Sequence, residues 1–410
     1  SDLTRDVIRA RAAEMEALSV APPSLDLSFT QKVYDVLRAD LRRSHRFRIV
    51  EYDGPVITRP SFASNSAVPK NAAYLLLLDF EELEESRIRC RAYLLQAGRS
   101  GLRFGRRYHC GTDGVIELAH RISDDVYQEV TGEVGMASSR IAYVARYRGN
   151  SAIFTISVDG RKSRRVLSGN FPCLFPRYAS GRNWLIYTAY KRGFPELFLS
   201  DLSSGRRHVI SSRPGLNSFG ALAPDGLSVA ATLSFCGNPE IYLLGMTGKV
   251  KLRLTRDRAC DLSPAWSPDG EKIVYVNDSS GQPQLYLRDA SGEGEAERLT
   301  WPFNSSSYCV EPDWSPTGEF IAFSARIEGN FDIMMMSPDG GDVKRLTRGG
   351  EQESSPSWAP DGRHLVFSSK GASGSVLRVI DSRNSKRGFI IELPRDQSNP
   401  RSPSWQRVVY

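Results

Sequence analysis

The chain of 410 residues is long enough for two ordinary domains or for one large array of repeats. Its 40% hydrophobic and 25% charged residues are typical of a folded globular protein and exclude the disordered and fibrous classes. No apolar run approaches the roughly 20 residues that a membrane-spanning helix requires, and no apolar signal segment follows Ser1–Arg5. Composition leaves two locations open: the cytoplasm, or an exported compartment reached with a signal segment that has since been removed.

The net charge of +7 comes from scattered basic residues, which are densest over Arg38–Arg48. Such a cluster suits either an anionic partner or the solvated C-terminal end of a helix, where cations favour the helix dipole. No aromatic platform or nucleic-acid-binding module accompanies it. We therefore interpret it as a helix end and predict no nucleic-acid partner.

The chain before the repeats divides into an arm and a small domain. Residues 1–24 are rich in Ala, Arg and Glu and predict a helix-prone or mobile N-terminal arm. Residues 25–134 predict an α/β domain, in which helices alternate with apolar strand patterns. Its expected elements are helices over 28–43 and 114–132, a strand over 72–80 and a hairpin around 98–101.

Six cysteines lie far apart with no C-x-x-C pair, which excludes a zinc ribbon. Cys90 and Cys110 flank the expected hairpin, so they would be able to form a disulfide in an oxidising compartment. The other four cysteines fall in the repeats and are expected to be small buried residues.

One short motif recurs in the second half of the chain, at Ser263–Val276, Glu311–Ser324 and Ser355–Ser369. In Trp266–Gly270 the proline presets φ for a turn and the glycine supplies the positive φ that ends it. The alternating run Lys272–Val276 then predicts a strand. Two more turns complete a unit of four short antiparallel strands, and a period in the mid-forties is typical of a β-propeller.

The second strand of this unit occurs six times, the first time at Arg140–Val144 without a strand before it. At the other end, Ser402–Trp405 is a first strand with nothing after it. We expect this C-terminal strand to complete the first blade. The predicted fold class is α+β: a small N-terminal α/β domain followed by a six-bladed β-propeller over residues 139–410, closed by a C-terminal strand.

A tryptophan ends the first strand in four units and is expected to pack between neighbouring blades. Two units lack it, and we place Arg177 and Leu222 in its position. The four tryptophans are Trp266, Trp314, Trp358 and Trp405.

Catalytic signals are missing from the sequence. The five histidines fall in no metal-ligand spacing, and no nucleophile elbow or phosphate-binding loop occurs. We expect His120 to be a packed helix residue and Asp225, Asp269 and Asp361 to serve their Asp-Gly turns. The sequence therefore favours a non-enzymatic binding protein without a cofactor or a metal.

The loops where first strands enter the central channel are the expected binding surface, because functional residues concentrate on loops held by a rigid scaffold. They are rich in Asn, Ser, Asp and Glu, which predicts an acidic rim for a basic partner segment. These loops cover residues 215–219, 258–263, 306–311, 351–355 and 399–402.

Several of these features together resemble one family. The junction Thr131–Arg146, the W-S-P-D-G repeats, the strand Ser375–Asp381 and the closing Ser402–Trp405 resemble TolB, the periplasmic component of the Tol–Pal system of Gram-negative envelopes. The resemblance covers nearly the whole chain from about Leu25. It implies a non-enzymatic monomeric scaffold in the periplasm that supports outer-membrane integrity and cell division.

The resemblance also implies partners and a site. It implies binding of the peptidoglycan-associated lipoprotein Pal at the channel mouth and contact with TolA through the N-terminal arm. The matching mouth positions are Leu216, Asn217, Phe219, Asp261, Leu262, Val310, Glu311, Ser354 and Arg401. The alternatives are a propeller hydrolase or lyase with a channel metal on Asp261 and Glu311, and a propeller that gates a separate peptidase.

Overall fold

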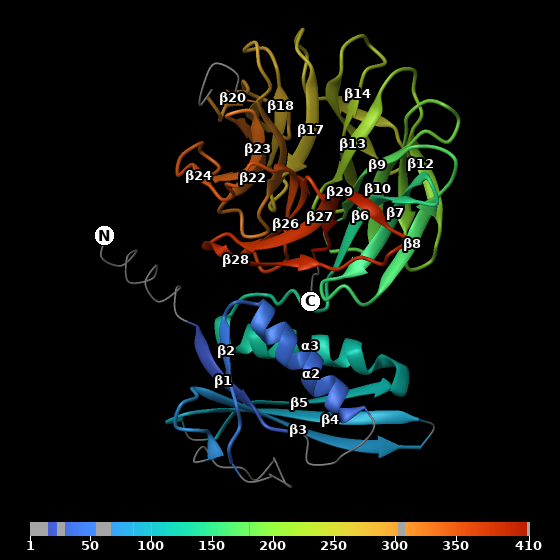
Figure 1. Cartoon of the computed structure of the whole chain (residues 1–410). Helices are drawn as coiled ribbons and strands as arrows, with labels where there is room; N and C mark the ends of the chain where they lie inside the picture. Colours follow the sequence, from blue (N-terminus) through green and yellow to red (C-terminus); the bar gives the residue numbers. More distant parts are fainter. Residues whose placement is uncertain are drawn as a thin grey trace. The chain divides into compact units, whose positions relative to one another are not determined.

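The computed structural model describes residues 15–22, 29–54, 67–84, 86–99, 101–179, 181–301 and 308–407. The chain divides into two compact units, Ser1–Ser138 and Ser139–Tyr410 (Figure 1). Within the described residues, no helix combines the length and the apolar character needed to cross a membrane.

The N-terminal unit is a five-stranded sheet with two helices packed on one face. The strand order is β2-β1-β3-β4-β5, with β1 parallel to both neighbours and β3, β4 and β5 antiparallel in succession. The elements are β1 (Glu16–Val20), α2 (Thr30–Arg43), β2 (Phe47–Val50), β3 (Tyr74–Leu83), β4 (Arg87–Gln96), β5 (Leu102–Gly111), the 3-10 turn η3 (Thr112–Gly114) and α3 (Val115–Thr131).

Both helices turn an apolar stripe toward the sheet, as their sequence period predicts. Gly132, with φ of 75°, ends α3 in the left-handed conformation that favours glycine. His120 on α3 is buried, and its Nδ1 lies 2.6 Å from Oδ2 of Asp40 on α2. His120 therefore helps to join the two helices, which confirms the prediction of a packed histidine.

The expectation of an N-terminal arm up to residue 24 is corrected in part. Residues 1–14 lie outside the described residues, but Glu16–Val20 form β1, which pairs with both β2 and β3. Leu18 and Val20 are buried in the core of this unit. The short run was missed because a parallel strand is specified by distant partners rather than by local pattern.

Cys90 and Cys110, which flank the expected hairpin, have free thiols in the structure. Cys90 lies opposite Tyr108, and Cys110 lies opposite Ile88, so the two cysteines are diagonal rather than direct cross-strand neighbours. Burial raises the pKa of the Cys90 thiol, which disfavours the reactive thiolate.

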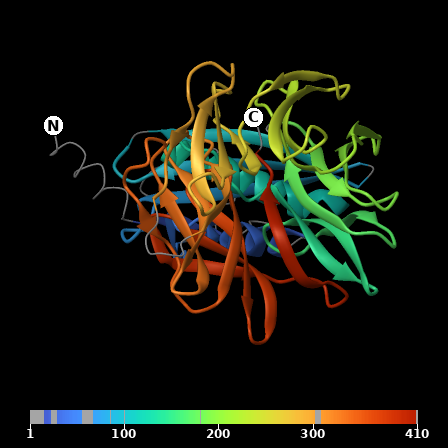
Figure 2. The same ribbon diagram turned by 90° about the horizontal axis from the view of Figure 1, so that it is seen from above.

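The C-terminal unit consists of six four-stranded antiparallel sheets. In Figure 2 the sheets follow one another around the propeller in the order of the sequence colours. The second blade consists of β9 (Cys173–Tyr178), β10 (Trp184–Ala189), β11 (Glu196–Asp201) and β12 (Arg207–Ser211). The third blade consists of β13 (Asn217–Leu222), β14 (Ser228–Leu233), β15 (Glu240–Gly245) and β16 (Val250–Arg253). The fourth blade consists of β17 (Asp261–Trp266), β18 (Lys272–Asn277), β19 (Gln284–Asp289) and β20 (Glu297–Arg298).

The remaining three blades include the one that closes the propeller. The fifth blade consists of β21 (Cys309–Trp314), β22 (Ile321–Ile327), β23 (Asn330–Met336) and β24 (Lys344–Arg345). The sixth blade consists of β25 (Gln352–Trp358), β26 (His364–Gly371), β27 (Gly374–Asp381) and β28 (Asn384–Ile391). The first blade is β6 (Arg140–Tyr147), β7 (Asn150–Ser157) and β8 (Ser163–Ser168), with β29 (Ser398–Trp405) paired antiparallel to β6. The predicted six blades and C-terminal closure are confirmed.

The tryptophans that end the inner strands pack between blades, as predicted. Trp266 belongs to a buried cluster with residues of the third blade, and its Nε1 donates to the Ala221 carbonyl oxygen at 3.0 Å. Trp358 is 0% exposed, and its Nε1 donates to the Asp313 carbonyl oxygen of the fifth blade at 3.1 Å. The indoles of Trp266 and Trp358 therefore each contribute both apolar area and one hydrogen bond to the joint between two blades, whereas Trp314 Nε1 donates to the Gly318 carbonyl oxygen in its own blade.

Replacing Trp358 with Ala is expected to lower the free energy of unfolding by about 3–5 kcal/mol, because it opens a cavity in a fully buried joint. Trp301, which is 67% exposed, provides the matched control, and Trp301→Ala should change stability by less than about 0.5 kcal/mol. Denaturant unfolding followed by near-UV circular dichroism measures both. Equal stability of the two variants would contradict an inter-blade role for Trp358.

Candidate functional site

The six inner strands, β9, β13, β17, β21, β25 and β29, surround the central channel and all begin at the same end of the propeller, called here the mouth. Each inner strand has a β-bulge at the same place, where two of its residues oppose one residue of the second strand. The first bulge residue has a positive φ in every blade. We call these six residues the waist of the channel; with their φ angles they are Phe175 (50°), Phe219 (50°), Ser263 (54°), Glu311 (55°), Ser355 (56°) and Ser402 (48°).

A left-handed conformation costs a non-glycine residue about 1–2 kcal/mol, so its repetition in six blades is a structural feature of the channel and not a local accident. The following residue is proline in five blades and Gly220 in the third. Proline has no N–H to donate, so it fits the bulge position that lacks a ladder partner. Strained backbone of this kind concentrates at functional sites, which identifies the waist as the candidate site.

The waist encloses a cavity of about 50 Å³, lined by the waist residues and by the residues that follow them. Its wall has two chemical halves. The rings of Phe175 and Phe219 are in contact, with centroids 4.1 Å apart and planes tilted by 32°, whereas Ser263, Glu311, Ser355 and Ser402 supply the polar half. A partner group in the channel would therefore meet an aromatic wall facing a polar one.

The Glu311 carboxylate is held by the neighbouring blade. Its Oε2 accepts hydrogen bonds from the Ser355 backbone N–H at 2.7 Å and from Ser324 Oγ at 3.1 Å. Its Oε1 accepts a hydrogen bond from Ser355 Oγ at 2.9 Å. These three bonds fix the orientation of the carboxylate, and the two from Ser355 link the fifth blade to the sixth at the waist.

Arg177 spans the channel next to the waist. Its guanidinium, carried by the second blade, donates to the carbonyl oxygen of Pro264 in the fourth blade at 2.9 Å and to that of Pro312 in the fifth at 3.3 Å. Burial lowers the pKa of Arg177 while nearby Asp313 acts in the opposite direction, and a guanidinium stays charged over any physiological pH. One cation thus bridges opposite walls through backbone carbonyls.

The placement of Arg177 corrects the sequence alignment. Tyr178 pairs with Leu185 as Trp266 pairs with Ile273, so Tyr178 and not Arg177 stands in the tryptophan position. A shift of one residue turns the side chain to the opposite face of a strand. Arg177 therefore lines the channel instead of packing between blades.

The structure separates the nine predicted mouth residues into three groups. Phe219 and Glu311 are waist residues. Leu216, Leu262, Val310 and Ser354 are partly buried and Arg401 is exposed, and these five lie close to the mouth ends of the inner strands. Asn217 and Asp261 are 0% exposed, so they cannot present their side chains to a partner in this conformation.

Asn217 has a structural role in the loop before β13. Its Oδ1 accepts hydrogen bonds from Ser211 Oγ at 2.5 Å and the Arg213 N–H at 3.1 Å. Its Nδ2 donates to the carbonyl oxygens of Pro195, Arg213 and Gly215. The side chain thus satisfies backbone groups that the loop would otherwise bury without partners.

Asp261 is also enclosed, where its Oδ1 accepts a hydrogen bond from Asn277 Nδ2 at 2.7 Å. Burial raises the pKa of Asp261 to about 7, although the hydrogen bonds from Thr255 and Asn277 act against this shift. Since Asp261 is buried and Glu311 is already bonded, neither carboxylate forms the acidic rim that the sequence suggested.

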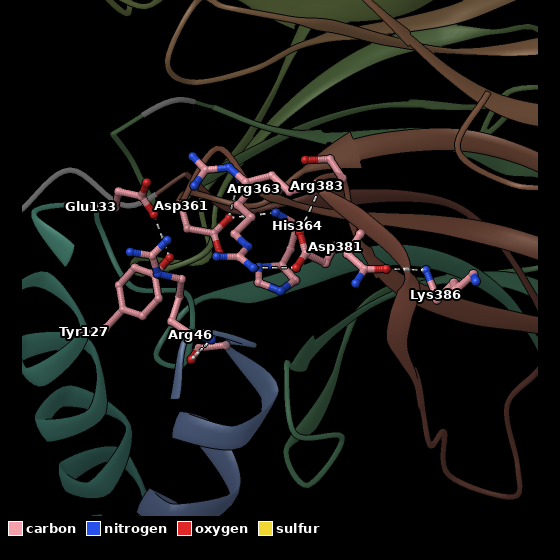
Figure 3. Close-up of polar contacts among 12 residues, drawn as sticks. Arg46, Tyr127, Glu133, Asp361, Arg363, His364, Asp381, Arg383 and Lys386 are labelled. Atoms are coloured by element: carbon pink, nitrogen blue, oxygen red, sulfur yellow. Dashed lines mark hydrogen bonds and ion pairs between the residues drawn. The ribbon is translucent and has the colours of Figure 1, made fainter. Parts of the chain in front are cut away.

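The aspartates of the Asp-Gly pairs accept hydrogen bonds within their turns, as predicted. Asp361 is in addition part of a buried group of charged side chains. Asp361 Oδ1 accepts hydrogen bonds from the N–H groups of Arg363 and His364, both at 2.9 Å (Figure 3). Its Oδ2 lies 2.5 Å from His364 Nδ1, and Arg363 pairs with Asp381 at 2.6 Å. Burial alone would raise the pKa of Asp361, but His364 and these hydrogen bonds lower it on balance.

The channel-metal alternative depended on Asp261 and Glu311. Within the described part of the propeller, no three His, Cys, Asp or Glu side chains bring ligand atoms within 4.8 Å of one another. The two carboxylates therefore belong to no metal-ligand cluster of that size.

Sequence reasoning missed most of the waist and the bridging role of Arg177. The available signal was the residue-proline pair that begins three residues before the aromatic position in five inner strands. Its meaning as a bulge with positive φ required the strand pairing.

The closed ring of blades, the aromatic joints between blades and the strained channel waist define the class of six-bladed β-propellers. Comparison with known families narrows this class: residues 127–409 match the family described as the TolB beta propeller domain. The chain belongs to this family.

Two named relatives and one solved structure match this chain over most of its length. The Tol-Pal system protein TolB of Gluconobacter oxydans is 28% identical over 367 residues, covering 88% of this chain and 79% of the relative. That of Bordetella pertussis is 28% identical over 400 residues, covering 97% and 90%. The crystal structure of TolB from Acinetobacter baumannii has a TM-score of 0.83 and 27% identity, and covers 96% of both chains.

The waist conformation can be tested at Ser263. Glycine adopts positive φ without steric cost, so Ser263→Gly is expected to raise the free energy of unfolding by about 0.5–1 kcal/mol. Ser263→Val should lower it by about 2 kcal/mol, because a β-branched residue is strained in this region. The control is Ser228→Gly in the extended strand β14, which should be destabilising; destabilisation by Ser263→Gly as well would contradict the assigned backbone.

The raised pKa of Asp261 predicts a pH effect on stability. The native carboxyl keeps its proton up to about pH 7, whereas in the unfolded chain it loses the proton near pH 4. Between these values the native state binds more protons, so this group lowers the free energy of unfolding as pH rises from 4 to 7. Asp261→Asn should remove that fall and be more stable than the wild type at pH 8 by on the order of 2 kcal/mol.

Denaturant unfolding at pH 5 and pH 8 measures this difference. Asp225→Asn, which changes an exposed turn carboxylate, is the control. An identical pH dependence in the wild type and Asp261→Asn would show that Asp261 titrates normally.

Proposed function

We propose that this chain is a non-enzymatic periplasmic scaffold of the Tol–Pal system that binds the peptidoglycan-associated lipoprotein Pal at the mouth of its propeller channel. In this role it supports outer-membrane integrity and envelope constriction at cell division. Family membership and the names of the relatives support the system to which it is assigned. Contact with TolA through the N-terminal arm, of which residues 1–14 lie outside the described residues, is part of the same proposal.

The observation that supports the location is the waist. Six strained residues meet around one small cavity, and Glu311 and Ser355 of the polar half are already oriented by hydrogen bonds between blades. A rigid, pre-oriented surface loses little conformational freedom when a partner binds. The partly exposed residues between the waist and the mouth, such as Leu262 and Ser354, are therefore the proposed contact surface.

Calorimetric titration of the full chain with the purified Pal domain of the same organism tests the proposal. The variant Leu216→Arg/Ser354→Arg changes two partly buried positions near the mouth, on the third and sixth blades. It should weaken binding at least tenfold, because two long charged side chains would obstruct the contact surface and lose hydration when the partner docks. The expected wild-type affinity lies in the micromolar range or tighter, as for other specific interfaces.

The matched control is Leu227→Arg/Ser291→Arg, which makes the same substitutions in exposed turns at the opposite end of the propeller. Near wild-type binding by this control, with loss in the mouth variant, supports the mouth as the site. Absence of binding by the folded wild type would refute the proposed partner, and equal loss in both variants would refute the proposed location.

A further inference from the structure

A second cavity, of about 280 Å³, lies on the first blade, where the closing strand meets β6 and β7. It is more than five times the volume of the waist cavity, which is about 50 Å³. Its polar lining comes from Arg146, Asn150, Ser151, Asn399 and Arg401. We call this cavity the seam pocket.

Strand pairing places the seam pocket at the mouth end of the propeller. Arg146 lies opposite Ser398, at the beginning of β29, and also opposite Ser151, near the beginning of β7. Arg401 is on β29 and lies opposite Val144 of β6, the strand that also carries Arg146. Two guanidinium groups from neighbouring strands therefore line one cavity beside the surface proposed to bind the partner.

Both arginines are exposed, and neither forms a salt bridge or a side-chain hydrogen bond with any described residue. No acidic side chain lines the seam pocket. The pocket thus holds two positive charges without a carboxylate partner, and a positive potential follows from their proximity.

Acidic residues at the mouth ends of the neighbouring blades already have partners. Glu196 of the second blade pairs with Arg192. Glu353 of the sixth blade pairs with Arg378 at 3.1 Å, and Glu351 lies 3.6 Å from the same guanidinium. The positive charge of the seam pocket is therefore not balanced by acids on either side.

The chemistry of the lining indicates the ligand. A guanidinium binds a carboxylate through two parallel N–H···O bonds, and two arginines in one pocket present donors from two directions. Ser151 Oγ donates to the Cys173 carbonyl oxygen at 3.0 Å, and Asn150 Nδ2 donates to Asn170 Oδ1 at 3.1 Å, so these neutral groups are already engaged. The two guanidinium groups and the Asn399 side-chain amide remain as the donors available to a ligand, and only the guanidinium groups carry charge.

We propose that the seam pocket binds the carboxylate of an acidic peptide segment presented by the protein partner, gripped between Arg146 and Arg401. This inference rests on the proposed function, because the pocket lies beside the mouth at which a protein is proposed to dock, and carboxylates are the anions of a protein surface. It reverses the charge expected from the sequence: the partner's contacting segment is acidic, not basic.

The test combines the Pal domain with a probe that does not depend on Pal. The double variant Arg146→Gln/Arg401→Gln removes both charges, and Arg206→Gln/Lys249→Gln removes two exposed charges from turns at the other end of the propeller. Binding of hexaglutamate to the full chain, followed by NMR titration at low salt, should weaken at least tenfold in the first variant and less than twofold in the second. Pal affinity should fall in the same order, with a reduced dependence on salt concentration.

The arms of the experiment separate the two proposals. Loss of hexaglutamate binding only in the pocket variant supports the seam pocket even when Pal itself fails to bind, an outcome that refutes the proposed partner alone. Equal hexaglutamate binding by the wild type and the pocket variant overturns the seam pocket whether or not Pal binds. Inorganic phosphate is the third probe, and tighter binding of phosphate than of hexaglutamate would overturn the assignment to a peptide carboxylate.

Discussion

The antiparallel pairing of β29 with β6 is the interaction on which the propeller depends. Each blade is a four-stranded sheet that buries its faces only against its neighbours, so an open array would leave two large apolar faces in water. Pairing of the first blade with the closing strand removes both faces in one step. Trp405 fixes the register of this closure, because its Nε1 donates to Ser139 Oγ at 2.7 Å and its backbone N–H donates to Ser357 Oγ at 3.0 Å.

Closure also creates the site. When six inner strands are brought around a single axis, a bulge at the same place in each strand turns six residues toward one small cavity. The channel is then linked across its walls by Arg177, and between adjacent blades by Glu311. The geometry of the waist is thus a property of the complete propeller and belongs to no single blade.

The sequence predicted the features that local chemistry encodes. Pro, Gly and alternating apolar residues specify turns and strands over a few positions, so six blades, the closing strand and the tryptophan joints could be read from the chain. The strand β1 could not, because Glu16–Val20 is short and its partners lie far along the chain. Positive φ at Phe219 or Glu311 has no local signal, and the polar residues Asn217 and Asp261 look like loop residues until the fold shows them buried.

The closing strand has a consequence for synthesis of the protein. Ser139 and Trp405, which meet in the closed first blade, are 266 positions apart in the chain. During translation, which proceeds from the N-terminus at about 5–20 residues per second, β6 emerges long before β29 and has an unpaired edge through the interval. An unpaired edge strand is a template for pairing with other chains. The growing propeller therefore passes through a period of vulnerability to aggregation that ends only when its final strand is made.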